Sequence, residues 1–173
     1  CVGKQSNPDI DFTALTVNYT EKFYSVGKIP GSYFKREGRP TEHEILICRL
    51  IDRSFRPLFP AHFHDEMHFT VQLLAFDKKN SPDVGTLAIL AASATMAIAG
   101  MPFNGTVAAA HVGKVNGELV LNPSYEAAES AELRLVVAGT ENGFHMVEAG
   151  ADEISEKDML SALAFAQEAM GGF

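Results

Sequence analysis

Three arginines recur at a spacing that could bind phosphate groups. Residues 42–59 follow a helical pattern with apolar side chains on one side, and Arg49, Arg53 and Arg56 recur at i, i+4 and i+7 on another side. A guanidinium keeps its charge and donates hydrogen bonds in a fork that matches phosphate oxygens, so this face suits an anion or a sugar-phosphate backbone. The spacing leaves an alternative open, because neighbouring acids, Asp52 among them, could neutralise the same arginines in salt bridges.

A second candidate for anion binding lies in the segment before this helix. Residues 24–40 are rich in Gly and Pro and have no hydrophobic periodicity, and loops this long are usually functional or disordered. The segment carries the tetrapeptide Tyr33-Phe34-Lys35-Arg36, followed by Arg39. Single-stranded nucleic acids bind to such pairs, because bases stack on the rings while phosphates meet the cations. The alternative is that the rings pack back onto their own domain.

Histidine and cysteine spacings indicate little chemistry of their own. His62, His64 and His68 could hold zinc if the first two share a strand face, although surface residues entering a strand explain the pattern as well. Cys1 and Cys48 cannot form a disulfide framework or a CxxC metal knuckle. This cysteine usage fits a reducing cytoplasm, which is where we expect the protein.

Composition favours one globular domain with an uneven charge distribution. The chain has 173 residues, 46% hydrophobic and 21% charged, with a net charge of −8. Residues 22–56 nevertheless contain eight basic and four acidic side chains. Such a local excess of positive charge attracts a polyanion, because dissolved salt screens the more distant acidic charges. A solvated charged face is the alternative. The longest apolar run, residues 87–99, is too short to span a bilayer, so no membrane association is expected.

The elements that position these residues follow from periodicity and capping signals. Strands are predicted at residues 12–19, 67–76, 106–115, 118–121, 133–138 and 144–148, and helices at residues 41–55, 84–99 and 155–169. Thr41 with Glu44 forms a capping box, Asp83 opens the middle helix, and Asn116-Gly117 predicts a tight hairpin turn. The middle helix is apolar all round and is expected to be buried between layers. This order predicts an α+β fold in which sheets and helices form a sandwich.

Several long motifs resemble the first core of the bacterial polynucleotide phosphorylase family. The resemblance extends over nearly the whole chain from Phe12 to Met170, and motifs of this length and order are highly specific. The matching runs are residues 27–40, 50–60, 100–105, 121–123, 136–140 and 146–148.

The resemblance implies an architecture and an assembly. The fold would be RNase PH-like, of the ribosomal protein S5 domain 2-like type, and residues 1–173 would form the first core. The chain would be a fragment that lacks the N-terminal strands of this core. In that family two such cores share one chain, and three chains close a homotrimeric ring around an RNA channel. Tyr33, Phe34, Lys35 and Arg36 would map onto the loop lining the channel constriction, with conservative departures at Tyr33 and Lys35. The three helix arginines would map onto residues that handle RNA or phosphate, and Arg39 belongs to the same matched run.

The same resemblance implies that this core lacks the catalytic centre. The active core holds a divalent metal on two aspartates, where this chain has Ala128 and Arg134, although Glu129 and Glu132 lie nearby as possible substitutes. The active core also has a serine-rich phosphate turn, where this chain begins with Asp83. We therefore expect no catalytic or metal-binding residue here. Mg²⁺ would belong to the second core, and inorganic phosphate would be a co-substrate of the whole enzyme.

The expected function follows from the resemblance. The whole protein would be a polyribonucleotide nucleotidyltransferase that degrades RNA from 3′ to 5′ by phosphorolysis and releases nucleoside diphosphates. This core would guide single-stranded RNA and build the ring, and further partners could come from the RNA-degradation machinery. Two alternatives remain at this point, a stand-alone RNase PH-type exoribonuclease and a purely non-catalytic RNA-binding or assembly module.

Overall fold

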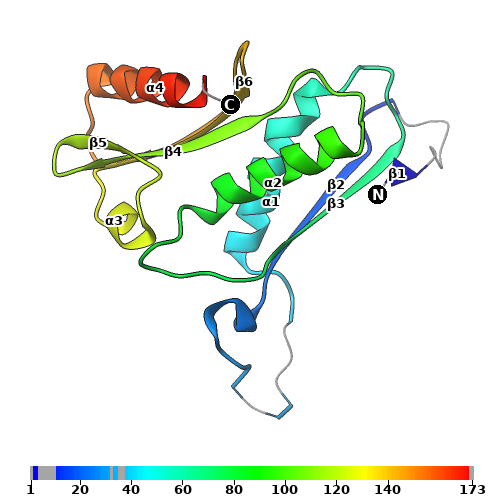
Figure 1. The fold of residues 1–173 in the computed structure, drawn as a ribbon, viewed down its shortest axis with the longest axis horizontal. Helices are drawn as coiled ribbons and strands as arrows, with labels where there is room; N and C mark the ends of the chain where they lie inside the picture. The colour runs from blue at the N-terminus through cyan, green and yellow to red at the C-terminus, as the bar shows by residue number, and fades with distance from the viewer. Residues whose placement is uncertain (1, 4–10, 32, 35–37, 172–173) are drawn as a thin grey trace.

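The computed structural model describes residues 2–3, 11–31, 33–34 and 38–171 (Figure 1). The strands are β1 (Val2–Gly3), β2 (Leu15–Glu21), β3 (Glu66–Leu73), β4 (Ala108–Val115), β5 (Glu118–Leu121), β6 (Leu133–Thr140) and β7 (Gly143–Ala151). The helices are η1 (Phe23–Val26), α1 (Glu42–Phe55), η2 (Arg56–Leu58), α2 (Val84–Ile98), α3 (Tyr125–Glu129) and α4 (Glu156–Met170), of which η1 and η2 are 3-10 helices.

The strands form two separate sheets. The first has the order β1-β3-β2, in which β2 and β3 run parallel, with Val17 opposite Phe69. The second has the order β5-β4-β6-β7 and is antiparallel throughout, with His111 of β4 opposite Val136 of β6. A parallel pair needs a long crossover, and the segment from η1 through α1 and η2 provides it.

Helices α1 and α2 lie between the two sheets, and α4 covers the outer face of the second sheet (Figure 1). The inner core joins Ile51 and Phe55 of α1 and Ile89 of α2 to residues of both sheets. The outer core packs Ala162 and Ala166 of α4 against Val112, Leu135 and Val137. The result is a layered sandwich of sheets and helices, so the predicted α+β fold is confirmed.

The local signals in the sequence act as expected. Thr41 accepts the N–H of Glu44 and Glu44 accepts the N–H of Thr41, which completes the capping box of α1. Asp83 and Ser155 cap α2 and α4. Asn116 and Gly117 both have positive φ values, 52° and 83°, as a tight hairpin turn requires.

Other expectations need correction. Helix α2 lies between the layers as predicted, but its burial is incomplete, because Leu87 is 43% exposed and Ile98 is 88% exposed. The short elements β1 and α3 carry too few residues for a periodic signal and were not predicted. Within the part of the chain that the structure describes, no helix is long and apolar enough to cross a membrane.

Candidate functional site

The segment between β2 and α1 projects away from the body of the fold, at the bottom of Figure 1. Tyr33 and Phe34 are 85% and 86% exposed, and their rings meet edge to face with centroids 5.1 Å apart. The alternative that these rings pack back onto the domain is therefore wrong. Arg39 is also exposed. Lys35 and Arg36 lie outside the described residues, so the complete tetrapeptide stays a prediction.

The first part of this projecting segment is anchored to the first sheet and the chain that follows it. The N–H of Phe76 donates to the carbonyl oxygen of Ser25 at 2.8 Å, and Gln72 donates from Nε2 to the hydroxyl of Tyr24 at 2.8 Å. Beyond η1 the chain extends into solvent, where Ile29 is 88% exposed. Sequence reasoning missed Ile29, an exposed apolar side chain in the same segment as the two rings.

A groove of about 740 Å³ runs between β2 and the outer side of α1. Residues 15–20 of β2 form one side, and the groove reaches Pro40, directly before the N-cap of α1, at the foot of the projecting segment. Arg49 and Arg53 line it from the helix. The groove thus runs from the root of the segment that carries Tyr33 and Phe34 along α1 to two guanidinium groups.

The three arginines predicted to bind phosphate differ in how strongly other residues of the fold bind them. Arg49 is exposed, and none of the ion pairs among the described residues involves it. Arg53 meets Glu148 at 3.5 Å, and both side chains are about half exposed. Exposed pairs of this kind contribute little to stability and can give way to a competing anion.

Arg56, by contrast, is held by contacts within the fold. Its Nε donates to Asp52 at 3.0 Å, and its Nη1 donates to the carbonyl oxygen of Thr13 at 2.7 Å. The Asp52 carboxylate and the backbone just before β2 therefore use the donors that would bind phosphate. The salt-bridge alternative that the spacing left open is therefore confirmed for Arg56 and Asp52, while RNA binding by Arg56 stays a prediction.

The positions expected to lack catalytic groups do not fit a divalent metal. Ala128 has no donor atom, and the guanidinium of Arg134 lies over Gly150. Glu129 lies beside Tyr125, where their hydrogen bond raises the pKa of the phenol, and Glu132 meets Lys114 at 3.9 Å. Among the described residues, no group of three or more His, Cys, Asp or Glu side chains is placed to hold a metal ion.

The histidines of the possible zinc motif have separate surroundings. His68 meets Glu66 at 3.1 Å within β3, and His64 faces the carbonyl oxygen of Phe12 at 3.4 Å. A different histidine stands out, since neither ring nitrogen of buried His111 has a hydrogen-bond partner among the described residues. Burial lowers the pKa of His111, an effect that Asp83 opposes and Arg134 supports.

Two family models together match almost all of this architecture. The model described as 3′ exoribonuclease family, domain 1, matches residues 1–102, which include the first sheet, α1 and α2. The model described as 3′ exoribonuclease family, domain 2, matches residues 105–169, which include the second sheet. The chain belongs to the 3′ exoribonuclease family. In this chain, the inner hydrophobic core contains residues from both matched parts, 1–102 and 105–169.

Relatives within the family are similar at the level of sequence and of fold. The chain is 52% identical over 165 residues to a polyribonucleotide nucleotidyltransferase of Pelagibacter ubique, a match that covers 95% of this chain and 24% of the relative. It is 50% identical over 169 residues to that of Acidiphilium cryptum, covering 97% of this chain and 23% of the relative. The chain therefore spans about a quarter of the length of these relatives. A crystal structure of rice (Oryza sativa) Rrp46 matches with a TM-score of 0.74 at 14% identity, covering 99% of this chain and 75% of that one, which shows the same fold.

Proposed function

We propose that this chain is the first RNase PH-like core of a polyribonucleotide nucleotidyltransferase, and that it guides single-stranded RNA without carrying the catalytic metal. The whole enzyme would degrade RNA from its 3′ end with inorganic phosphate and release nucleoside diphosphates. The support is about 50% identity over nearly the whole chain to polyribonucleotide nucleotidyltransferases, together with the exposed aromatic pair of Tyr33 and Phe34.

The aromatic pair is the observation that carries the RNA-guiding role. Burying two large rings would stabilise the fold by removing apolar area from water, yet both rings stay exposed on a projecting segment. A base can stack on such a ring whatever its sequence, at about 1–3 kcal/mol per base. A strand held there could continue along the groove, where Arg49 and Arg53 would meet its phosphates.

A non-catalytic role for this core fits the chemistry of its side chains. Mg²⁺ prefers oxygen ligands and usually at least one carboxylate, while the matching positions hold Ala128 and Arg134. The residues here thus do not fit the metal, which the second core of the enzyme would bind. A stand-alone exoribonuclease is less well supported for this reason, whereas a non-catalytic RNA-binding or assembly module remains compatible with the same residues.

Assembly into a homotrimeric ring in the cytoplasm is part of the proposal, with the RNA-degradation machinery as a further partner. The exposed apolar face of α2, with Leu87 and Ile98, is the kind of surface that assembly would cover. A chain that stays monomeric at high concentration by analytical ultracentrifugation would argue against ring formation by this core.

RNA binding can be tested with a labelled single-stranded RNA oligomer and fluorescence anisotropy over a salt series. Phe34→Ala should weaken binding by about 1–3 kcal/mol without changing the salt dependence, because it removes stacking only. Arg49→Ala should lower the slope of log K against log salt by about 0.7, the value for one phosphate contact with a single strand. If neither variant changes affinity or slope, the RNA-guiding role is wrong.

Catalysis needs a separate measurement. The 173-residue chain alone should release no nucleoside diphosphate from RNA in the presence of phosphate and Mg²⁺. Release that EDTA abolishes would contradict the assignment of the metal to the second core and favour the stand-alone exoribonuclease.

A further inference from the structure

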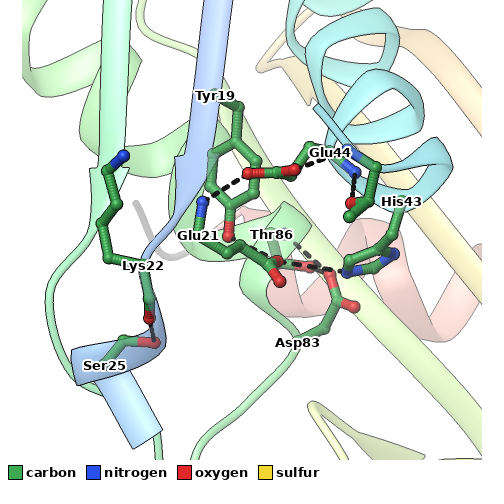
Figure 2. A network of polar contacts seen from close by, with 9 residues as sticks. Tyr19, Glu21, Lys22, Ser25, His43, Glu44, Asp83 and Thr86 are labelled. Carbon is green, nitrogen blue, oxygen red and sulfur yellow. Dashed lines mark hydrogen bonds and ion pairs between the residues drawn. The ribbon is translucent and has the colours of Figure 1, made fainter. Parts of the chain in front are cut away.

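One buried carboxylate joins the two ends of the projecting segment. Glu44, in the first turn of α1, is only 7% exposed. Its Oε1 accepts the N–H of Glu21 at 2.7 Å, and its Oε2 accepts the N–H of Thr41 at 2.6 Å (Figure 2). Glu21 is the last residue of β2 and Thr41 is the N-cap of α1, so these two donors flank the whole segment 22–40.

The carboxylate is suited to holding both donors. Burial alone would raise the pKa of Glu44, but the N–H donors of Glu21 and Thr41 outweigh burial and hold that pKa below its ordinary value. A hydrogen bond to an ionised acceptor contributes more than one between neutral groups. Glu44 also donates its own N–H to Oγ1 of Thr41 at 3.2 Å, which fixes its place in the helix.

A second set of contacts holds the first end of the segment. The side chain of Glu21 accepts from the hydroxyl of Tyr19 at 3.0 Å and meets Nε2 of His43 at 3.3 Å, as Figure 2 shows. Ser25 of η1 donates from Oγ to the carbonyl oxygen of Lys22, the residue before η1, at 2.7 Å. Strand, helix and segment are therefore joined at one place, while Tyr33 and Phe34 are exposed beyond it.

We propose that Glu44 is a positioning residue for RNA, because it holds the two ends of segment 22–40 together and so sets where Tyr33 and Phe34 meet a strand. The proposal rests on the proposed function. Closing a long segment costs chain entropy, and fixing both ends beforehand removes part of the ordering cost when RNA binds. Glu44 does not touch the RNA itself.

The test compares Glu44→Gln with Glu42→Gln. Glutamine has one acceptor oxygen, so it can keep only one of the two N–H donors, while Glu42 is an exposed acid in the same turn of α1. Hydrogen–deuterium exchange should become at least about tenfold faster at the Glu21 or the Thr41 amide of Glu44→Gln, with β3 as an unchanged internal reference. RNA affinity should fall about tenfold, and adding Phe34→Ala should cost little more because both changes act through one segment. Glu42→Gln should change neither measurement.

The outcomes separate the two proposals. Unchanged exchange at both the Glu21 and Thr41 amides, or unchanged RNA affinity while Phe34→Ala weakens binding, would overturn the positioning role of Glu44. If Phe34→Ala has no effect while Arg49→Ala does, only the positioning role fails; if neither variant has an effect, the proposed RNA function itself fails. Should Glu44→Gln not fold, the wild-type chain still decides the point, because its Glu21 and Thr41 amides must exchange more slowly than the amide of Ile29, which is 88% exposed and has no hydrogen-bond acceptor among the described residues. Equal exchange at these amides would contradict the inference.

Discussion

Asp83 accepts hydrogen bonds from both the backbone N–H of Thr86, at 2.8 Å, and its hydroxyl, at 3.1 Å. A carboxylate of the chain therefore occupies the N-terminus of α2, the end of a helix that attracts anions. The resemblance implies a phosphate turn at this position in an active core, and here an internal anion takes that place.

Replacing this cap should cost stability in a graded way. Asp83→Ala should lower the free energy of unfolding by about 1 kcal/mol, because the N–H of Thr86 loses its acceptor. Asp83→Ser should cost less, since serine is also a good N-cap. Urea denaturation of the two variants measures the difference, and equal losses would contradict the capping role.

Arg56 and Arg49 should behave as opposites. Arg56→Ala should lower the free energy of unfolding by about 2 kcal/mol, because the carbonyl oxygen of Thr13 and the carboxylate of Asp52 lose a charged donor. Arg49→Ala should change stability by less than about 0.5 kcal/mol, since Arg49 is exposed. Chemical denaturation of both variants checks this contrast. A stable Arg56→Ala with weakened RNA binding would return Arg56 to the anion-binding face.

Buried His111 should make the fold sensitive to acid. Its pKa is lowered by burial, so below its ordinary pKa the unfolded chain binds a proton more readily than the folded chain. Stability should be complete above about pH 6.5 and decline as the pH falls from there towards the lowered folded pKa. His111→Leu should flatten this decline when unfolding is followed in urea between pH 5 and pH 7. An unchanged pH slope would show that His111 is not the group responsible.

His43 should act in the opposite direction and in a higher pH range. Its hydrogen bond with Glu21 raises the pKa of His43, despite burial, so the folded chain binds the proton more tightly. This contribution is complete below about pH 6.5 and is lost as the pH rises through the raised folded pKa. It should be less than about 1 kcal/mol because the His43 side chain is 58% exposed and screened by solvent. His43→Gln should remove this slope above pH 6.5, and NMR titration of the His43 ring should report the raised pKa directly.

Gly139 is required near the end of β6, just before the turn that joins β6 to β7. A Cβ there would overlap the carbonyl oxygen of Gly143, at the register shift after Ala138. Gly139→Ala should therefore lower the free energy of unfolding by about 1–3 kcal/mol, as forced overpacking does. Gly38→Ala is the matched control, because a Cβ there meets nothing within 4 Å. Thermal denaturation of the two variants should separate them, and similar melting temperatures would contradict the close approach.

The sequence by itself determined the features that depend on near neighbours. Thr41 and Glu44 lie within one helical turn, so their residue types alone predict the capping box that begins α1. Asn116-Gly117 likewise predicts its turn, because few residue pairs adopt two positive φ values. Periodicity predicted the main strands and helices and the α+β class for the same reason.

Only the tertiary structure decided what depends on residues far apart in the chain. Oε1 of Glu44 accepts the N–H of Glu21, 23 residues away, and Arg56 donates to the carbonyl oxygen of Thr13, 43 residues away. Helical spacing placed Arg56 with Arg49, but it contains no information on which strand edge will lie beside the end of the helix. The packing of α1 along β2 therefore brings Arg56 into contact with the backbone before β2 and leaves Arg49 exposed at the groove. The same packing brings the capping residue Glu44 to the end of β2, where it joins the two ends of segment 22–40.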